Sequence, residues 1–404
     1  MRILMICKYP PIQGGVSAEC YWTAQCLAEM GNAVSVLTNA QEVEDDYRIT
    51  MNPEDEKLLS GFWKSNTVRV VSTYSDKHHI FVPQTNPFVS KLLSLGMNMV
   101  QDEKPDLIWA HYIEPYGVVA FLLSRLTGIP YVIRHAGSDI GRLMPTAQLR
   151  AIHCKVLQNS IAVITHQLHH ERFVQLGVPF HSLIRSTSVK TMPDLFFPTP
   201  FSIHSPIVLG VYGKTGESKG TDALFDALTL LRKEEVRIKV RAHWGGRNIS
   251  QYLQKIRDFA LDGDTLNVSG FIAHWRIPEF IRSCDAIFFL ENRFSIGFHH
   301  SSVPLEVVSC GRPVITTAEM ARKPFYENIL KDGKNAFVIE GNITGEKVAA
   351  EVKRVKDVFG GQGDVHLSSP SFVSRVHLRI RLYKLLEDIR LRLSYHSFGK
   401  EQMI

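Results

Sequence analysis

The sequence predicts an α/β protein with two doubly wound parallel sheets, one in each half of the chain. Short apolar runs alternate with helical stretches, which is typical of parallel sheets covered by helices on both faces. The chain has 404 residues, and a single hydrophobic core stops growing at about 250–300 residues. A Pro- and Phe-rich linker at 192–206 separates the two alternating series. We therefore expect domains at 1–197 and 198–371, followed by a C-terminal helical segment at 372–404.

The first forty residues show the repeating unit most clearly. Residues 2–7 (RILMIC) are expected to form a buried strand, and a loop rich in Pro and Gly follows. Apolar residues at helical spacing over 16–30 predict a helix, and 33–38 (AVSVLT) the next strand. Further strands are expected at 68–71, 106–111, 131–135, 162–166, 181–186, 207–212, 237–244, 266–269, 286–290, 313–317 and 336–340, and further helices at 118–127, 222–232 and 372–393.

Composition limits the classes of partner. The formal net charge of +6 suits anionic small molecules or an anionic membrane surface. No basic run with interleaved aromatic residues is present, so a nucleic-acid partner is not expected. The 17 histidines show no metal-binding spacing, and no metal is expected.

The predicted location is cytoplasmic. The six cysteines are scattered, as in a reduced protein, and no secretory signal is recognised at the N-terminus. No apolar run approaches the roughly 20 residues that cross a bilayer. Peripheral contact with the inner surface of a membrane stays open.

Ligands of open parallel sheets bind beyond the carboxyl ends of the strands, so the residues that follow each strand are site candidates. After the first strand, Gly14 and Gly15 lead into a helix, where backbone N–H groups can bind phosphate. The alternative is a simple turn. His111 and His135 each end a strand, and each is either structural or a hydrogen-bond donor to a sugar or phosphate.

The second half offers a cationic glycine-rich loop at 213–220 (GKTGESKG), directly before a predicted helix. Lys214 and Lys219 on this loop would suit a diphosphate. The loop is not a Walker motif, and the alternative is a solvated loop with surface lysines.

A short helix is predicted within 299–311 (HHSSVPLEVVSCG), with Pro304 near its start and Gly311 just past its end. Glu306 lies in the first turn of this apolar helix. Its carboxylate would suit a ribose diol, or it pairs with the helix dipole.

In layout and motifs, the chain resembles the retaining GT-B glycosyltransferases of family four (group 1 type), which include bacterial polysaccharide, glycolipid and natural-product enzymes. The resemblance rests on HAGSD at 135–139, GKTGESKG at 213–220 and PLEVVSCGRPVITT at 304–317, in that order. It implies two Rossmann-like domains facing a central cleft, with the C-terminal helix crossing back to the first domain. The implied activity is sugar transfer from a nucleotide-diphosphate sugar, with UDP-sugar favoured, to a hydroxyl acceptor, without metal or other cofactor.

The resemblance also implies the role of each site residue. Catalytic roles fall to His135, which would touch the donor sugar or phosphate, and to Lys219, which would stabilise the leaving diphosphate. Glu306 would bind the ribose hydroxyls. The full set implied for donor and diphosphate binding is Gly14, Gly15, Lys214, Lys219, Ser301, Ser302 and Glu306.

The sequence departs from the family at one position. The family has two glutamates separated by seven residues, and the position of the first is Phe298 here. His299 and His300 are candidates to contact the donor sugar instead, and Glu291 is one only if the intervening loop folds back. This departure keeps open a non-catalytic sugar-nucleotide-binding protein or partner subunit. A sugar-nucleotide epimerase or hydrolase on the same fold is a further alternative.

Overall fold

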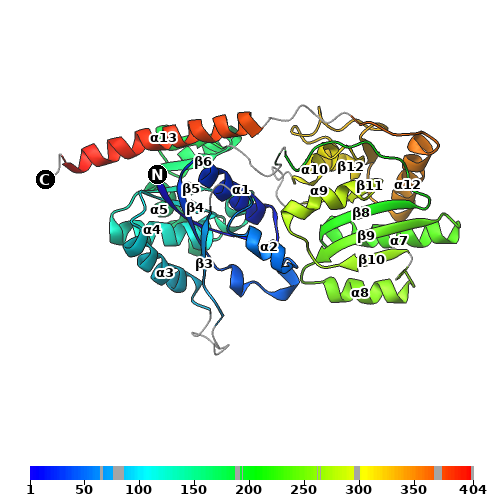
Figure 1. The fold of residues 1–404 in the computed structure, drawn as a ribbon, viewed down its shortest axis with the longest axis horizontal. Coiled ribbons are helices and arrows are strands. Elements are labelled where there is room, and N and C mark those ends of the chain that lie inside the picture. Colours follow the sequence, from blue (N-terminus) through cyan, green and yellow to red (C-terminus); the bar gives the residue numbers. More distant parts are fainter. Residues whose placement is uncertain are drawn as a thin grey trace. The chain divides into compact units, whose positions relative to one another are not determined.

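The computed structural model divides the chain into two compact units (Figure 1). The first comprises Met1–Val43, Met51–Lys190 and Ser374–Ile404, and the second Glu44–Thr50 and Thr191–Val373. The structure describes residues 1–63, 67–75, 86–186, 192, 194–261, 263, 265–294, 301–367 and 375–401.

The first unit is built on a parallel sheet of seven strands in the order β3-β2-β1-β4-β5-β6-β7. Its central strands are buried apolar runs, as expected of strands covered on both faces. The bounds are β1 Arg2–Cys7, β2 Ala33–Thr38, β3 Arg69–Ser72, β4 Leu107–His111, β5 Tyr131–Arg134, β6 Ala162–Thr165 and β7 Leu183–Arg185.

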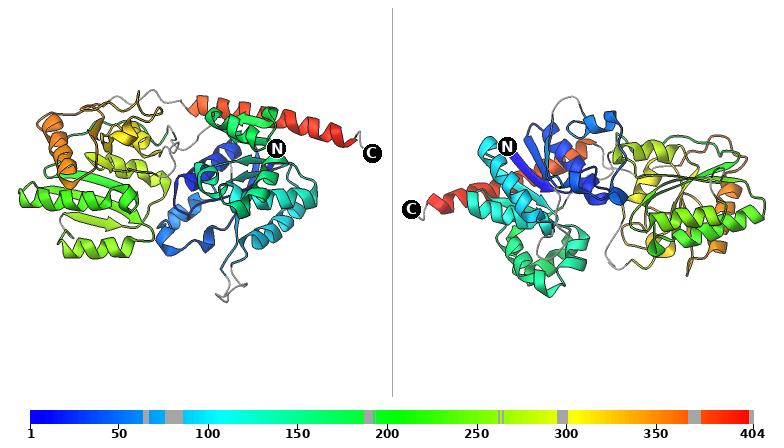
Figure 2. Two further views of the ribbon diagram at one scale, coloured as in Figure 1. Left: turned by 180° about the vertical axis from the view of Figure 1, so that it is seen from behind. Right: turned by 90° about the horizontal axis from the view of Figure 1, so that it is seen from below.

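Helices cover both faces of this sheet (Figures 1 and 2). Helices α3 (Phe88–Glu103) and α4 (Val118–Thr127) pack with the core residues of one face, including Ile6 and Ile108. Helix α1 (Gly15–Glu29) is buried from Ser17 to Ala28. The remaining helices of the unit are α2 Pro53–Leu58, α5 Ala147–Gln158, α6 His170–Gln175 and α13 Arg375–Glu401.

The second unit is built on a parallel sheet of six strands in the order β10-β9-β8-β11-β12-β13. Helices α7 and α12 pack with one core cluster, while α9 and α10 pack with another, so both faces are covered. Its strands are β8 Ile207–Lys214, β9 Ile238–Gly245, β10 Leu266–Ser269, β11 Ala286–Phe289, β12 Val314–Thr317 and β13 Ala336–Ile339. Its helices are α7 Thr221–Lys233, α8 Ile249–Asp258, α9 Ile277–Arg282, α10 Val303–Ser309, α11 Ala318–Ala321 and α12 Gly345–Phe359.

These elements confirm the predicted α/β class with two doubly wound sheets, and β1, β2 and β10 have the predicted bounds. Two features of the fold were not predicted. Helix α3 lies in a segment for which no helix was predicted. Residues 44–50 belong to the second unit, where Gly246 N donates to Asp46 O at 2.7 Å and Thr50 N to Phe271 O at 2.8 Å.

Candidate functional site

The loop between β8 and α7 is shaped by its glycines. Gly213, Gly216 and Gly220 have φ values of 118°, 150° and 67°, a region that favours glycine. A Cβ at Gly213 or Gly216 would meet no atom within 4 Å, whereas one at Gly220 would lie 2.6 Å from Leu290 Cβ. The first two glycines therefore face open space, and the third allows the loop to pack against the end of β11.

Both predicted lysines lie on this loop. Lys214 is the last residue of β8, and its ammonium lies 5.1 Å from the centre of the Tyr47 ring. The Lys219 ammonium forms an ion pair with the Glu291 carboxylate and lies 4.9 Å from the centre of the Phe294 ring. The Glu291 side chain is 1% exposed and that of Lys219 is 27% exposed. Lys219 is thus a partly buried cation with an internal counter-ion, not a freely solvated surface lysine.

Glu306 is buried on α10, and both of its carboxylate oxygens accept hydrogen bonds. Tyr212 Oη donates to Oε2 at 2.7 Å, and His274 Nε2 donates to Oε1 at 3.2 Å. Burial alone would raise the pKa of Glu306, but the hydrogen bonds from His274, Ser302 and Tyr212 and the nearby His274 ring outweigh it and lower the pKa. Glu306 is therefore held ionised beneath the surface.

The start of α10 carries the predicted serines. Ser302 is the N-cap residue, and its backbone carbonyl accepts from Glu306 N at 2.9 Å. The carbonyl of Ser301 accepts a hydrogen bond from Tyr326 Oη. Three further positions lie outside the described residues. They are the predicted His299 and His300, and Phe298, where the sequence differs from the family.

These groups lie beyond the carboxyl ends of strands in one sheet. Lys214 ends β8, Glu291 follows β11 and His274 follows β10. Because the chain leaves β8 toward β9 but adds β11 on the other side, the β8/β11 boundary is a topological switch point, where open α/β sheets bind ligands. Cations beside a buried carboxylate suit a ligand with both phosphates and hydroxyl groups.

Sequence reasoning missed two residues of this cluster, Tyr212 and His274. Tyr212 lies within β8, where it reads as part of an apolar run. His274 lies in a loop that follows β10, and no spacing relates it to Glu306, 32 residues further on. Only the three-dimensional contact reveals that these two residues set the ionisation of Glu306.

The predicted residues of the first unit lie at the carboxyl edge of its sheet. Gly14 is the N-cap of α1 with φ 131°, a Cβ there would meet nothing within 4 Å, and Gly15 begins the helix. His135 follows β5, with Nε2 2.6 Å from Thr165 Oγ1 and the ring 4.9 Å from that of Phe173. Burial lowers the pKa of His135 to about 3, so the imidazole is neutral at physiological pH.

His111 is buried, and its Nδ1 lies 3.1 Å from Cys20 Sγ. Asp139, the last residue of the HAGSD motif, had no predicted role. Asp139 is fully buried, and its Oδ2 accepts from the backbone N–H of Ala136 at 2.9 Å and of Ile113 at 3.2 Å. Burial raises the pKa of Asp139 to about 7.

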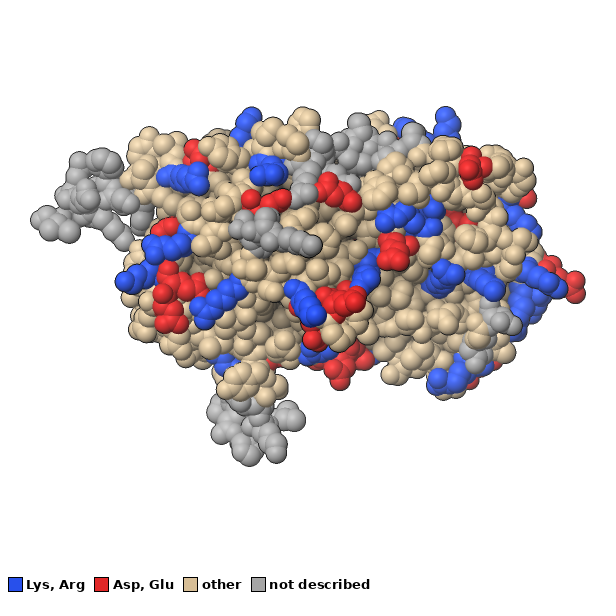
Figure 3. Space-filling view, viewed as in Figure 1, with Lys and Arg blue, Asp and Glu red and all other residues tan. Residues whose placement is uncertain are grey.

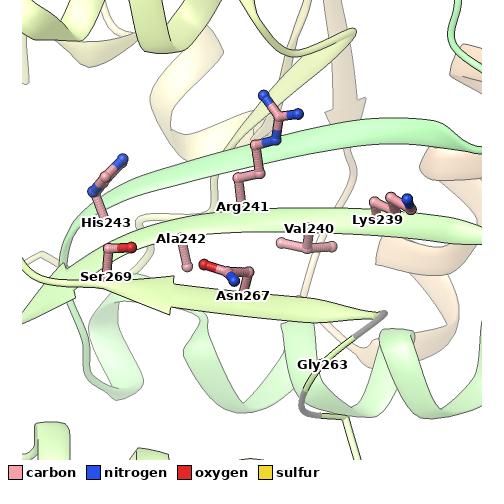
Figure 4. Close-up of a pocket in the computed structure, with 8 residues that line it drawn as sticks. All are labelled: Lys239, Val240, Arg241, Ala242, His243, Gly263, Asn267 and Ser269. Atoms are coloured by element: carbon pink, nitrogen blue, oxygen red, sulfur yellow. The ribbon is translucent and has the colours of Figure 1, made fainter.

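A hollow of about 450 Å³ lies along the strands of the second unit (Figure 4). It is lined by residues of β9 and β10, including His243 and Ser269 near the carboxyl ends of these strands. Arg241 Nη1 donates to Ser283 Oγ at 3.0 Å, and His243 Nδ1 to Gly270 O at 3.0 Å. The lining residues are Lys239, Val240, Arg241, Ala242, His243, Gly263, Asn267 and Ser269.

Basic and acidic side chains are interspersed over the face drawn in Figure 3, without a single large basic patch on that face. Within the described ranges, no three His, Cys, Asp or Glu side chains are grouped so that they could hold a metal ion. A search of the same residues finds no helix with the length and apolar character needed to cross a bilayer.

Comparison with known proteins defines the class. Residues 197–357 match the family described as Glycosyl transferases group 1, and residues 85–167 match Glycosyl transferase 4-like. An uncharacterized glycosyltransferase of Methanocaldococcus jannaschii is 24% identical over 251 residues. That match covers 61% of this chain and 65% of the relative, so it spans just under two thirds of the relative's length.

Solved structures share the whole fold. Anabaena HepE in complex with UDP-glucose has a TM-score of 0.60 at 15% identity, covering 96% of this chain and 99% of that one. A UDP-GlcNAc 2-epimerase from Methanocaldococcus jannaschii has a TM-score of 0.59 at 11% identity, covering 96% and 99%. Sucrose-phosphate synthase from Thermosynechococcus elongatus has a TM-score of 0.58 at 13% identity, covering 97% and 99%.

The fold is thus the two-domain, Rossmann-like GT-B fold, as predicted. The segment that matches the group 1 glycosyltransferase family, 197–357, contains Lys214, Lys219, Glu291 and Glu306.

Proposed function

We propose that this protein is a retaining glycosyltransferase that moves a sugar from a nucleotide-diphosphate sugar to a hydroxyl group of an acceptor. The observation that carries the proposal is the cluster at the β8/β11 switch point, where Lys214 and Lys219 share one sheet edge with the ionised Glu306. This cluster lies within the segment that matches the family. We favour a UDP-sugar as donor, because a structural neighbour was solved with UDP-glucose.

In the proposed reaction, the bond between the anomeric carbon and the diphosphate oxygen breaks, and the acceptor oxygen bonds to the same face of that carbon. The acceptor's proton passes to the departing phosphate oxygen. Lys214 and Lys219 offset the charge that develops on the diphosphate, which is the largest electrostatic demand of such a step. We assign Glu306 to the ribose hydroxyls and His135 to the sugar as a neutral hydrogen-bonding group.

We also propose that the transfer needs neither metal nor other cofactor, because two lysines can neutralise the leaving group. Activity in the presence of a chelator tests this part. Loss of activity on chelation, with recovery when Mg²⁺ or Mn²⁺ is added back, would show that it is wrong. The cytoplasmic location stays a proposal, supported by the free state of all six cysteines.

The first test is a thermal-shift screen against UDP-, GDP-, ADP- and dTDP-sugars in chelator, since a ligand that binds only the folded state raises the melting temperature. Nucleotide release is then measured with and without pools of hydroxyl acceptors. Release that depends on an acceptor supports the transferase. Release without any acceptor, or a changed sugar configuration, would instead identify a hydrolase or an epimerase.

A second candidate function is a non-catalytic sugar-nucleotide-binding protein or partner subunit. It is favoured by Phe298 at the position where the family has its first glutamate, and by the ion pair that already occupies Lys219. Donor binding of ordinary strength, with no release in any acceptor pool, would select this candidate.

A further inference from the structure

The outer face of the last helix, α13, carries an apolar stripe that the proposed function does not use. Helix α13 (Arg375–Glu401) belongs to the first unit, where it packs against β7 (Figure 1). Its inner seam is fully buried and explains this packing. The seam consists of Leu378, Leu382, Leu385, Leu386 and Ile389.

Four large apolar side chains point the other way. Val376, Ile380, Tyr383 and Leu391 are 65%, 47%, 54% and 57% exposed. At about 100° per residue, they fall within one stripe on the side opposite the inner seam, and the exposed residues Glu387 and Ser394 lie in the same stripe. We call this stripe the outer stripe. A surface helix normally has polar residues on its exposed side, so packing within the protein does not explain these exposed apolar side chains.

Exposed cations flank the outer stripe on both sides. Residues 376–395 contain five Lys or Arg and two Asp or Glu, a net charge of 5 − 2 = +3. Arg379, Lys384 and Arg390 are exposed, and Arg390 Nη1 lies 2.5 Å from Glu387 Oε1. Tyr395, 69% exposed, follows at the C-terminal end of the stripe.

We propose that the outer stripe docks α13 on an anionic membrane surface, with the helix lying in the plane of the interface. Apolar residues bordered by Lys and Arg, with tyrosines among them, are the pattern of helices that lie at the boundary between lipid headgroups and acyl chains. The charge also decides between occupants. A second copy of this chain would bring two cationic faces together, whereas an anionic lipid surface complements them.

The proposal does not depend on the catalytic assignment. Sedimentation of the full-length protein with lipid vesicles tests it, comparing phosphatidylcholine alone with phosphatidylcholine mixed with phosphatidylglycerol. We expect binding to the anionic vesicles only, and weaker binding as salt rises.

Two variants separate the apolar and charged contributions. Ile380→Ser/Tyr383→Ser/Leu391→Ser leaves the inner seam intact and should weaken vesicle binding at least about tenfold. Arg379→Gln/Lys384→Gln/Arg390→Gln should weaken it by about ten- to a hundredfold. As a matched control, Leu126→Ser/Phe259→Ser removes exposed apolar side chains (62% and 40% exposed) away from α13 and should bind as the wild type does.

Three results would overturn the proposal: a wild type that does not bind anionic vesicles, equal binding by the Ile380/Tyr383/Leu391 variant, or equal binding to neutral vesicles. Light scattering adds a fourth. If the wild type is a dimer and that triple variant is a monomer, the outer stripe is an interface between copies of the chain. Unfolding midpoints by urea identify any variant that has lost stability.

Discussion

The ion pair between Lys219 and Glu291 allows a sharp test of whether Lys219 binds a ligand or only stabilises the fold. The perturbation is Lys219→Met, which keeps most of the aliphatic stem but removes the charge. It removes the ammonium group that pairs with the Glu291 carboxylate, whose side chain is 1% exposed. Glu291→Gln and the double variant complete a double-mutant cycle.

The expected loss of stability follows from the exposure of the two partners. Breaking a fully buried pair costs about 3–5 kcal/mol. Because the Lys219 side chain is 27% exposed, water replaces part of the lost interaction, and we expect a loss of about 2 kcal/mol. Adding Glu291→Gln should recover most of this loss, because no buried charge then remains unpaired. Urea unfolding of the four proteins measures both quantities.

Donor affinity should respond differently. If Lys219 contacts the diphosphate, Lys219→Met removes a charge-assisted hydrogen bond, worth about 1.5–3 kcal/mol or roughly ten- to a hundredfold in affinity. Glu291→Gln should not restore that loss in the double variant. Lys214→Met, on the same loop, is the comparison variant and should also weaken donor binding. Unchanged donor affinity in both lysine variants would refute the diphosphate assignment.

Three further predictions concern buried groups. Glu306→Gln should lower stability by about 1–3 kcal/mol and weaken donor binding, because an amide cannot accept from both Tyr212 and His274; urea midpoints equal to wild type would contradict this. His135→Ala should lower turnover more than donor affinity, and equal losses in both would argue for a binding role. Because the pKa of His135 is about 3, this residue does not titrate above pH 5. The pH–activity profiles of wild type and variant should therefore have the same shape above pH 5. Asp139 has a folded-state pKa of about 7 against 3.8 unfolded, so the folded state binds more protons in that window and its stability falls as pH rises. Asp139→Asn should therefore gain stability relative to wild type by roughly 2 kcal/mol between pH 5 and pH 8, and a pH-independent difference between the two proteins would show that Asp139 does not titrate there.

The fold could be predicted from the sequence because its signals are local. Each central strand is an apolar run of four to eight residues, and each is bounded by glycine, proline or polar residues, so strands and crossover helices can be recognised one at a time. The prediction failed where structure depends on distant partners. Residues 44–50 join the second unit through backbone hydrogen bonds to Gly246 and Phe271, and nothing in their own sequence indicates this.

The site shows the same division. Lys214, Lys219 and Glu306 could be found because each lies on a recognisable motif, GKTGESKG at 213–220 or PLEVVSCGRPVITT at 304–317. Their partners could not be found, because Glu291 and His274 reach them only across neighbouring strands of the sheet. The motif thus predicts which residues carry charge, while their contacts within the protein determine how strongly each charge can interact with a ligand.

The partners change how donor binding should be understood. Lys219 is paired with Glu291, and Glu306 accepts from Tyr212 and His274, so a donor that binds these groups must exchange these contacts for its own. Donor affinity then depends on the difference in free energy between the contacts within the protein and the contacts with the donor. Glu291→Gln shows whether Glu291 opposes or favours donor binding. If Glu291 only competes for Lys219, removing its charge should tighten donor binding. If Glu291 instead serves the sugar in place of the missing first glutamate, the same change should weaken it. The direction in which Glu291→Gln changes donor affinity therefore shows whether Glu291 is only a counter-ion of Lys219 or a residue that binds the sugar. It also decides between two explanations for how this chain can function with phenylalanine at position 298.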